Sequence, residues 1–104
     1  MKKKVLVDKN AAKELKKIDR KVRAKIDARV KILERDGGLE EPYGKKLEDN
    51  LYEIRVKVGV QWRVLYAYLQ EEFIILLSAF NKKTQKTPKN ELEKAKQRLE
   101  RYPS

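Results

Sequence analysis

The segment LYEIRVKVGVQWRVLYAYLQEEFIILLSAF, residues 51–80, decides the fold. In its first part Glu53, Arg55 and Lys57 alternate with apolar residues. This period of two is typical of a strand with one face on a core and the other in water. Gly59 and the polar run 70–72 supply turns between three apolar runs. The segment therefore predicts a meander of three antiparallel strands at 52–58, 60–69 and 73–80.

Helical periodicity precedes this meander. Apolar residues recur at spacings of three and four between Ala11 and Leu33, and Asp19 can cap a second helix within that range. We therefore expect a helical hairpin, begun by a cap at Asp8 or Asn10 and ended at Gly37-Gly38, where glycine relieves a left-handed cap.

The remaining segments complete the domain. Residues 4–7 read as a short first strand, and residues 39–50 carry no periodic pattern and are expected to form a loop. A last helix is predicted to start at Thr87-Pro88, with Thr87 as cap and an apolar stripe that runs to Tyr102. The order of strand, helical hairpin, meander and helix predicts a single α+β domain over residues 1–104.

The charge balance points to an anionic partner. The chain has 27 Lys+Arg against 16 Asp+Glu, a net charge of +11. A surface this basic attracts polyanions and accelerates encounters with them. We therefore expect nucleic acid as the partner.

The absence of histidine and cysteine restricts the chemistry. Disulfides and thiolate metal sites are excluded, and a metal site or other cofactor is not expected because only carboxylates remain as side-chain ligands. The lysine-rich start lacks the apolar run of a signal peptide, and the apolar run 73–77 is too short to span a membrane. These features predict a cytoplasmic protein.

A cationic face is the candidate site. Arg55, Lys57 and Arg63 point to the sheet face opposite the apolar residues of their strands, and lysines 82, 83 and 86 follow the third strand. Guanidinium forks bind phosphate oxygens in pairs, and ammonium groups add point charge. The pattern therefore predicts a phosphate-binding surface. A merely solvated sheet face is the alternative.

Such a surface supplies most of what RNA cleavage needs. A ribose 2′-hydroxyl that attacks the adjacent phosphorus must be aligned and deprotonated, and the negative charge that grows during the attack must be neutralised. A lysine whose pKa is lowered by neighbouring cations could take the proton. Glu53 is the alternative base, or it pairs with Arg55 or Arg63 and holds that arginine in place. Phe80, beside the basic loop, is a candidate for base stacking.

The motifs of these strands resemble a known family. They comprise Leu51-Tyr52-Glu53-Ile54-Arg55, Trp62-Arg63-Val64-Leu65-Tyr66, and the segment from Phe80 to Pro88 with Glu91 and Ala95. In combination they are similar to the phage-derived branch of the HigB toxins, within the RelE/ParE superfamily of type II toxin–antitoxin systems. The resemblance covers nearly the whole chain.

This resemblance implies a RelE-like fold and a toxin that cleaves mRNA in the ribosomal A site without a metal. It also implies inhibition by a cognate helix-turn-helix antitoxin. It matches Arg55 and Arg63 with strand positions that contact the scissile phosphate, and Lys82 and Lys83 with a cationic loop, so we expect catalytic roles for these four. From the pattern of the strands and the loop we expect RNA-binding roles for Glu53, Lys57, Phe80, Thr84 and Lys86. Two alternatives stay open, namely a ParE-like toxin that poisons DNA gyrase and a non-catalytic basic module that binds RNA or the ribosome.

Overall fold

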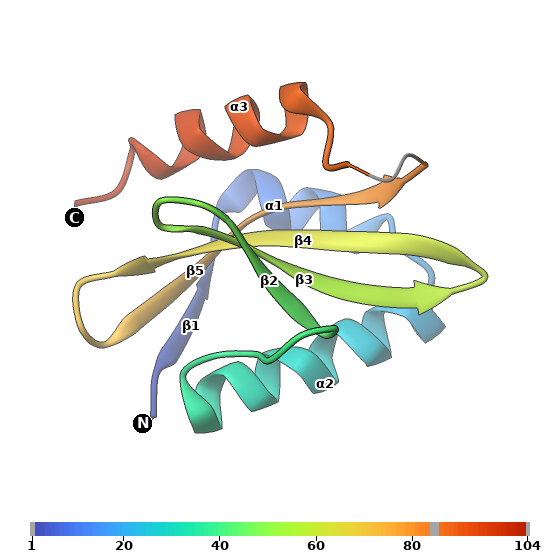
Figure 1. The fold of residues 1–104 in the computed structure, drawn as a ribbon, viewed down its shortest axis with the longest axis horizontal. Helices are drawn as coiled ribbons and strands as arrows, with labels where there is room; N and C mark the ends of the chain where they lie inside the picture. The colour runs from blue at the N-terminus through green and yellow to red at the C-terminus, as the bar shows by residue number, and fades with distance from the viewer. Residues whose placement is uncertain (1, 84–85, 104) are drawn as a thin grey trace.

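The protein forms a five-stranded sheet between one helix on one face and two helices on the other (Figure 1). The computed structural model describes residues 2–83 and 86–103. This arrangement of helices on a β-sheet confirms the predicted α+β class. In chain order the elements are β1 (Lys4–Val7), α1 (Lys9–Lys16), α2 (Arg20–Asp36), β2 (Gly44–Glu48), β3 (Leu51–Val58), β4 (Val60–Leu69), β5 (Phe73–Lys82) and α3 (Lys89–Leu99).

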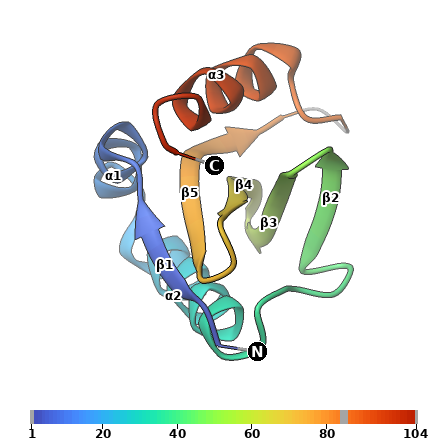
Figure 2. The same cartoon turned by 90° about the vertical axis from the view of Figure 1, so that its left-hand side faces the viewer.

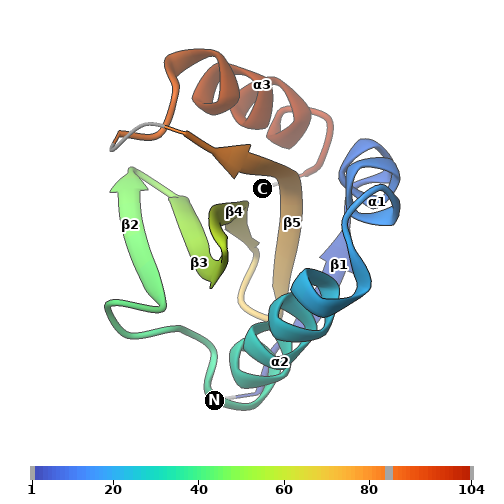
Figure 3. The ribbon, with the colours of Figure 1, turned by 90° about the vertical axis from the view of Figure 1, so that its right-hand side faces the viewer.

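The strands are arranged in the order β1-β5-β4-β3-β2. The predicted meander is β3, β4 and β5, which pair antiparallel, and β1 joins β5 in parallel. Figures 2 and 3 show β1 and β2 at opposite edges of the sheet, with α3 on one side. Because β5 lies inside the sheet and is covered on both faces, its sequence is apolar on both faces.

The prediction of a loop over residues 39–50 is wrong for residues 44–48. Residues 44–48 form β2, which pairs antiparallel with β3 and places Lys45 opposite Glu53. Its sequence, GKKLE, has no alternating apolar pattern because an edge strand gains most of its order from the ladder with its neighbour. Local sequence therefore contains little signal for this strand.

The predicted caps of the first two helices are confirmed. The Asp8 carboxylate accepts hydrogen bonds from the backbone N–H groups of Asn10 and Ala11, at 2.9 and 3.1 Å, and Asp19 caps α2 in the same way. Gly37 ends α2 with φ of 80°, in the left-handed region.

The predicted cap of the last helix is wrong. Pro88 occupies the N-cap position of α3 and makes no side-chain cap bond, while the Thr87 hydroxyl donates to Glu53 at 2.9 Å. The hydrogen bond to the buried Glu53 carboxylate is charge-assisted, which is the stronger kind, and it directs the Thr87 side chain toward the sheet.

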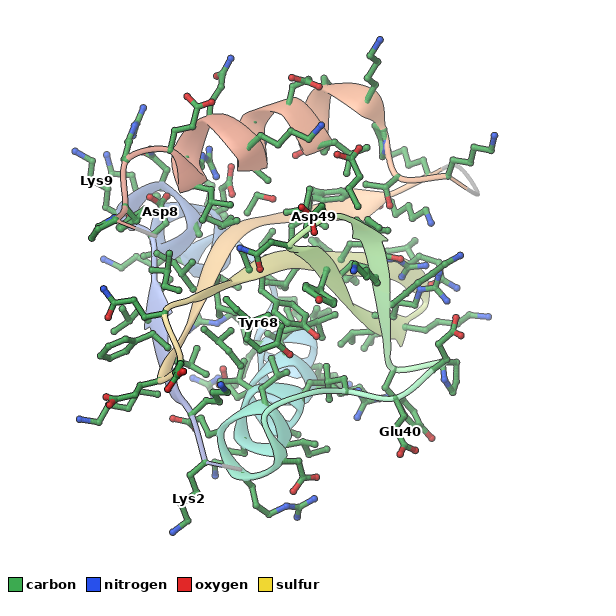
Figure 4. The ribbon with its side chains drawn as sticks, turned by 60° about the vertical axis from the view of Figure 1, so that its left-hand side comes forward. Lys2, Asp8, Lys9, Glu40, Asp49 and Tyr68 are labelled. Carbon is green, nitrogen blue, oxygen red and sulfur yellow. The ribbon has the colours of Figure 1, made fainter. Side chains whose placement is uncertain are left out.

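Two apolar clusters fill the two faces of the sheet. The larger lies between the sheet and α1 and α2, and includes the buried Ile26, Leu33 and Tyr66. Tyr68 packs against this cluster, between the sheet and α2, and its hydroxyl donates to the Gly37 carbonyl at 2.7 Å (Figure 4). The smaller cluster lies under α3 and includes Ala95.

Ionic contacts bind α3 to α1. Both Glu14 carboxylate oxygens accept from Arg98, at 2.9 and 3.0 Å, and Lys94 lies 3.2 Å from Glu14. Just beyond the C-terminal end of α3 the Tyr102 hydroxyl donates to Asp8, which lies below that end of the helix in Figure 4. We call Glu14, Lys94 and Arg98 the Glu14 cluster.

None of the helices within residues 2–83 and 86–103 is long and apolar enough to cross a membrane.

Candidate functional site

The site begins with two arginines that face each other across two strands. Arg55 on β3 and Arg63 on β4 are directly opposed in the register. Two like charges in this position repel, so the pairing needs compensation. Glu53 supplies it. Arg55 Nε donates to one Glu53 oxygen at 2.9 Å, and Arg63 Nε lies 3.4 Å from the other.

Glu53 is held rigidly between these arginines. Its side chain is only 1% exposed, and it also accepts the hydrogen bond from Thr87. A buried carboxylate is stable only when it is paired and hydrogen-bonded, and here both conditions are met. Glu53 therefore orients the Arg55 guanidinium and ties the segment before α3 to the sheet. The Arg63 guanidinium is offset in charge by Glu53 and is oriented by Gln61 and the Trp62 carbonyl, to which its Nη1 donates at 2.8 and 3.0 Å.

Lys82 adds a buried cation to the same face. It is the last residue of β5, lies opposite Gln61 in the register and is 6% exposed. Burial lowers the pKa of Lys82, and the charge of Arg63 lowers it further. Glu53 opposes this shift, whereas Arg55 reinforces it. The ammonium group thus lies in a field that favours proton release more than water does.

Positive charge exceeds negative charge at this site. Lys45 on β2 also contributes to the lowered pKa of Lys82, so one carboxylate faces two arginines and two lysines. We call Glu53, Arg55, Arg63 and Lys82 the Glu53 cluster. A group of cations with one carboxylate among them is poised to bind an added anion, and phosphate fits the forked donors of arginine.

An open cleft gives access to this cluster. Its volume is about 240 Å³, and we call it the central cleft. Arg55, Lys82 and Glu53 contribute to its wall, and Leu92 of α3 closes one side. The described lining residues are Lys45, Lys46, Leu47, Glu53, Arg55, Lys82, Lys86, Thr87 and Leu92.

The other predicted site residues are distributed unevenly. Lys86 lines the central cleft, and Lys57 lines a neighbouring hollow that also includes Arg55. Lys83 is exposed and is not among the described lining residues of either. Thr84 lies outside the described residues.

Phe80 does not occupy the position expected of a stacking residue. It is 9% exposed and packs in the apolar cluster under α3, opposite Arg63 in the register. The ring lies on the same face of the sheet as Arg63 and is buried there because α3 covers it. We therefore correct its expected role to packing.

Sequence reasoning missed three contributors. Lys45 and Lys46 reach the cleft only because β2 forms, and Thr87 was interpreted as a helix cap. The two adjacent lysines before the meander were a weak signal, since paired lysines also occur on any solvated surface.

The fold and this site define a class, a small basic α+β protein with a group of cations around one carboxylate on a face of its sheet. Residues 13–100 match the family described as phage derived protein Gp49-like (DUF891). The chain belongs to this family. A search of curated protein sequences found no match.

Solved structures share the fold. A mutant of the Escherichia coli toxin RelE in the free state matches with a TM-score of 0.74 and 20% identity, over 95% of this chain and 99% of that one. The intact E. coli RelBE toxin–antitoxin complex matches with a TM-score of 0.66 and 19% identity, over 79% and 99%. The RelBE2 toxin–antitoxin complex of Mycobacterium tuberculosis gives 0.60 and 18%, over 79% and 100%. At these identities the likeness establishes a RelE-like fold.

Proposed function

We propose that the protein is a HigB-like toxin of a type II toxin–antitoxin system, an endoribonuclease that cleaves mRNA in the ribosomal A site and stops translation. The observation that carries this proposal is the Glu53 cluster, where Arg55, Arg63 and Lys82 surround a single carboxylate. The RelE-like fold, shared with toxins, supports the same reading.

The cluster suits a reaction in which the substrate supplies its own nucleophile. The ribose 2′-hydroxyl loses its proton and attacks the adjacent phosphorus, the bond to the 5′-oxygen of the next nucleotide breaks, the departing 5′-oxygen takes up a proton, and a 2′,3′-cyclic phosphate forms. The protein aligns these groups and offsets the charge that grows on the phosphoryl oxygens. No side-chain nucleophile is needed.

Each residue then has a defined role. Arg55 and Arg63 hold the scissile phosphate with their guanidinium forks, and Lys82 approaches the developing charge from β5. Glu53 and Thr87 are positioning residues, because their contacts fix the arginines rather than leaving them to rotate in water. Lys86, at the wall of the cleft, adds attraction for the RNA backbone.

The partners follow from the same proposal. The substrate complex is the ribosome with mRNA in its A site, which places the protein in the cytoplasm. A cognate helix-turn-helix antitoxin neutralises the toxin and contributes acidic residues against the +11 surface. A toxin–antitoxin complex without contact to any lysine or arginine would contradict this.

Primer extension tests the proposal directly. An mRNA is translated in a purified system with the wild-type protein, with Arg63→Ala and with Lys82→Ala. We expect A-site cuts with the wild type and their loss in both variants. Undiminished cleavage in the variants would remove the assignment of the site.

The same assay separates the two alternatives. If the wild type makes no cuts and instead linearises plasmid in the presence of DNA gyrase, the protein is a ParE-like gyrase poison. If it binds RNA with a steep salt dependence and leaves the RNA intact, it is a non-catalytic basic module.

A further inference from the structure

A second hollow lies beside the Glu53 cluster, where the edge of β3 is exposed beyond the start of β2. The pairing of β2 with β3 begins at Gly44 opposite Ile54, and the Tyr43 carbonyl accepts from the Arg55 N–H at 2.8 Å. Within the described chain, residues 56–58 have no strand partner on that side. The segment before β2 turns away toward α2, which leaves a hollow of about 460 Å³. We call it the hairpin hollow.

The charge of this hollow is one-sided. It is lined by five cationic side chains, and its described lining contains no carboxylate. In contrast, the hollow beside the N-terminal strand mixes lysines with Glu34 and Glu72. A concave surface with one sign of charge concentrates an anionic ligand. The five cations are Lys25, Arg29, Arg55, Lys57 and Arg63.

One aromatic ring accompanies these cations. Tyr43 is 51% exposed, and the guanidinium carbon of Arg29 lies over its ring at 4.4 Å from the centroid. The Arg29 Nε is buried and has no hydrogen-bond partner among the described residues, so this guanidinium is held chiefly by the ring. A half-exposed tyrosine fixed beside cations is a surface on which an unpaired base stacks.

Two residues connect this hollow with the proposed catalytic site. Arg55 lines both the hairpin hollow and the central cleft, and Arg63 lines the hairpin hollow while it pairs with Glu53. A chain of phosphates bound at Arg55 and Arg63 therefore continues into the hairpin hollow without leaving a cationic surface.

We infer that the hairpin hollow is a subsite for the single-stranded RNA that flanks the cleaved bond, with Tyr43 stacking on a base and Lys25 and Lys57 binding a neighbouring phosphate. The inference rests on the proposed function, because it extends the path of the same RNA. An acidic polypeptide is the other ligand that this charge could attract. RNA is favoured because the hollow combines an exposed ring with an uninterrupted connection to the arginine pair.

Binding of uncleavable RNA tests the inference independently of catalysis. Fluorescence anisotropy would compare a 2′-O-methyl hexanucleotide with a 2′-O-methyl dinucleotide. For Lys25→Gln combined with Lys57→Gln, we expect about tenfold weaker hexanucleotide binding and a salt slope smaller by about 1.4, since each single-strand phosphate contact contributes about 0.7. Tyr43→Ala should weaken binding of the hexanucleotide by about tenfold, because one base loses its stacking partner. Dinucleotide binding should change by less than about twofold.

Lys13→Gln combined with Lys31→Gln is the matched control, because it removes the same charge from exposed positions outside the described lining of both hollows. An equal loss in this control, or an equal loss for the dinucleotide, would overturn the subsite. If a hexaglutamate peptide displaces the bound hexanucleotide as effectively as unlabelled hexanucleotide does, the RNA subsite is overturned and an acidic polypeptide is the ligand. If wild-type protein makes no A-site cuts but the hexanucleotide results hold, the proposed function fails and the RNA subsite stands.

Discussion

Two carboxylates of this protein, Glu14 and Glu53, each pair with two cations, but the charged groups around them differ. Glu14 on α1 accepts both donors of the Arg98 fork, lies 3.2 Å from Lys94 and also accepts from the Ala79 N–H. Glu53 on β3 pairs with Arg55 and Arg63. Both clusters join elements distant in sequence.

The difference is the balance of charge. In the Glu14 cluster Lys94 is shared with Glu91 at 2.8 Å, so two carboxylates match two cations. Around Glu53, Lys82 and Lys45 join the two arginines, and positive charge remains. A balanced cluster fixes a helix, and an unbalanced one is ready for an anionic ligand. Charge balance, rather than burial or hydrogen bonding, distinguishes the two clusters.

Removing one lysine from each cluster should give the largest contrast. Lys82→Ala is expected to reduce the rate of A-site cleavage by about 10²–10³-fold, the usual cost of losing one group that stabilises transition-state charge. Lys94→Ala should leave the rate within about threefold. Initial rates of cleavage on translated mRNA measure both. Equal losses would show that the two clusters are not functionally distinct.

Neutralising Glu14 should instead affect stability. Glu14→Gln is expected to lower the free energy of unfolding by about 2 kcal/mol, because Arg98 and the Ala79 N–H lose a charged acceptor. Urea denaturation measures this. Glu93→Gln on the exposed side of α3 is the control and should change stability by less than about 0.5 kcal/mol. Cleavage by the folded Glu14→Gln protein should remain near wild type.

The contribution of Glu14 should disappear in acid. Burial raises the pKa of Glu14, but hydrogen bonds from Arg98 and Ala79 and the charge of Lys94 outweigh burial and hold that pKa below its ordinary 4.5. The unfolded chain therefore binds this proton first as pH falls, and the stabilisation is lost as pH drops from 4.5 through the folded pKa. The stability difference between wild type and Glu14→Gln should be full at about pH 7 and should shrink progressively as the pH falls below 4.5. A difference independent of pH would contradict the assigned role.

The smallest expected effect concerns Thr87. Thr87→Val keeps the shape but removes the hydrogen bond to Glu53, so stability should fall by about 1 kcal/mol. Because Glu53 then holds the arginines less firmly, cleavage should fall by a few fold. Thr87→Ser retains the hydroxyl and should behave as wild type. Urea denaturation and initial rates together show whether the bond serves the site as well as the fold.

The sequence predicted the parts of the fold that strong local patterns encode. The alternation of residues in β3 and β4 has a period that only a strand satisfies, and the apolar stripe from Ala11 to Leu33 has a period that only a helix satisfies. The helix caps Asp8, Asp19 and Gly37 could be predicted because a cap depends on residues nearby in the chain. The placement of Arg55 and Arg63 on one face of the sheet followed from the meander, whereas their direct pairing is set by the register that the structure shows.

Other features depended on distant neighbours. β2 exists through its ladder with β3, Thr87 turns to Glu53 instead of capping α3, and Phe80 is buried because α3 covers β5. None of these can be read from the residues nearby in the chain, since each depends on a contact formed only after the elements assemble.

The sequence by itself determined the period of each long element, the α+β class and the excess of positive charge, because these are properties of neighbouring residues and of sums. Only the tertiary structure decided which charges remain uncompensated. Glu14 and Glu53 look alike in the sequence, but packing surrounds Glu14 with a matched set of charged partners and Glu53 with a surplus of cations. Electrostatic balance depends on distances through space, which local sequence does not specify.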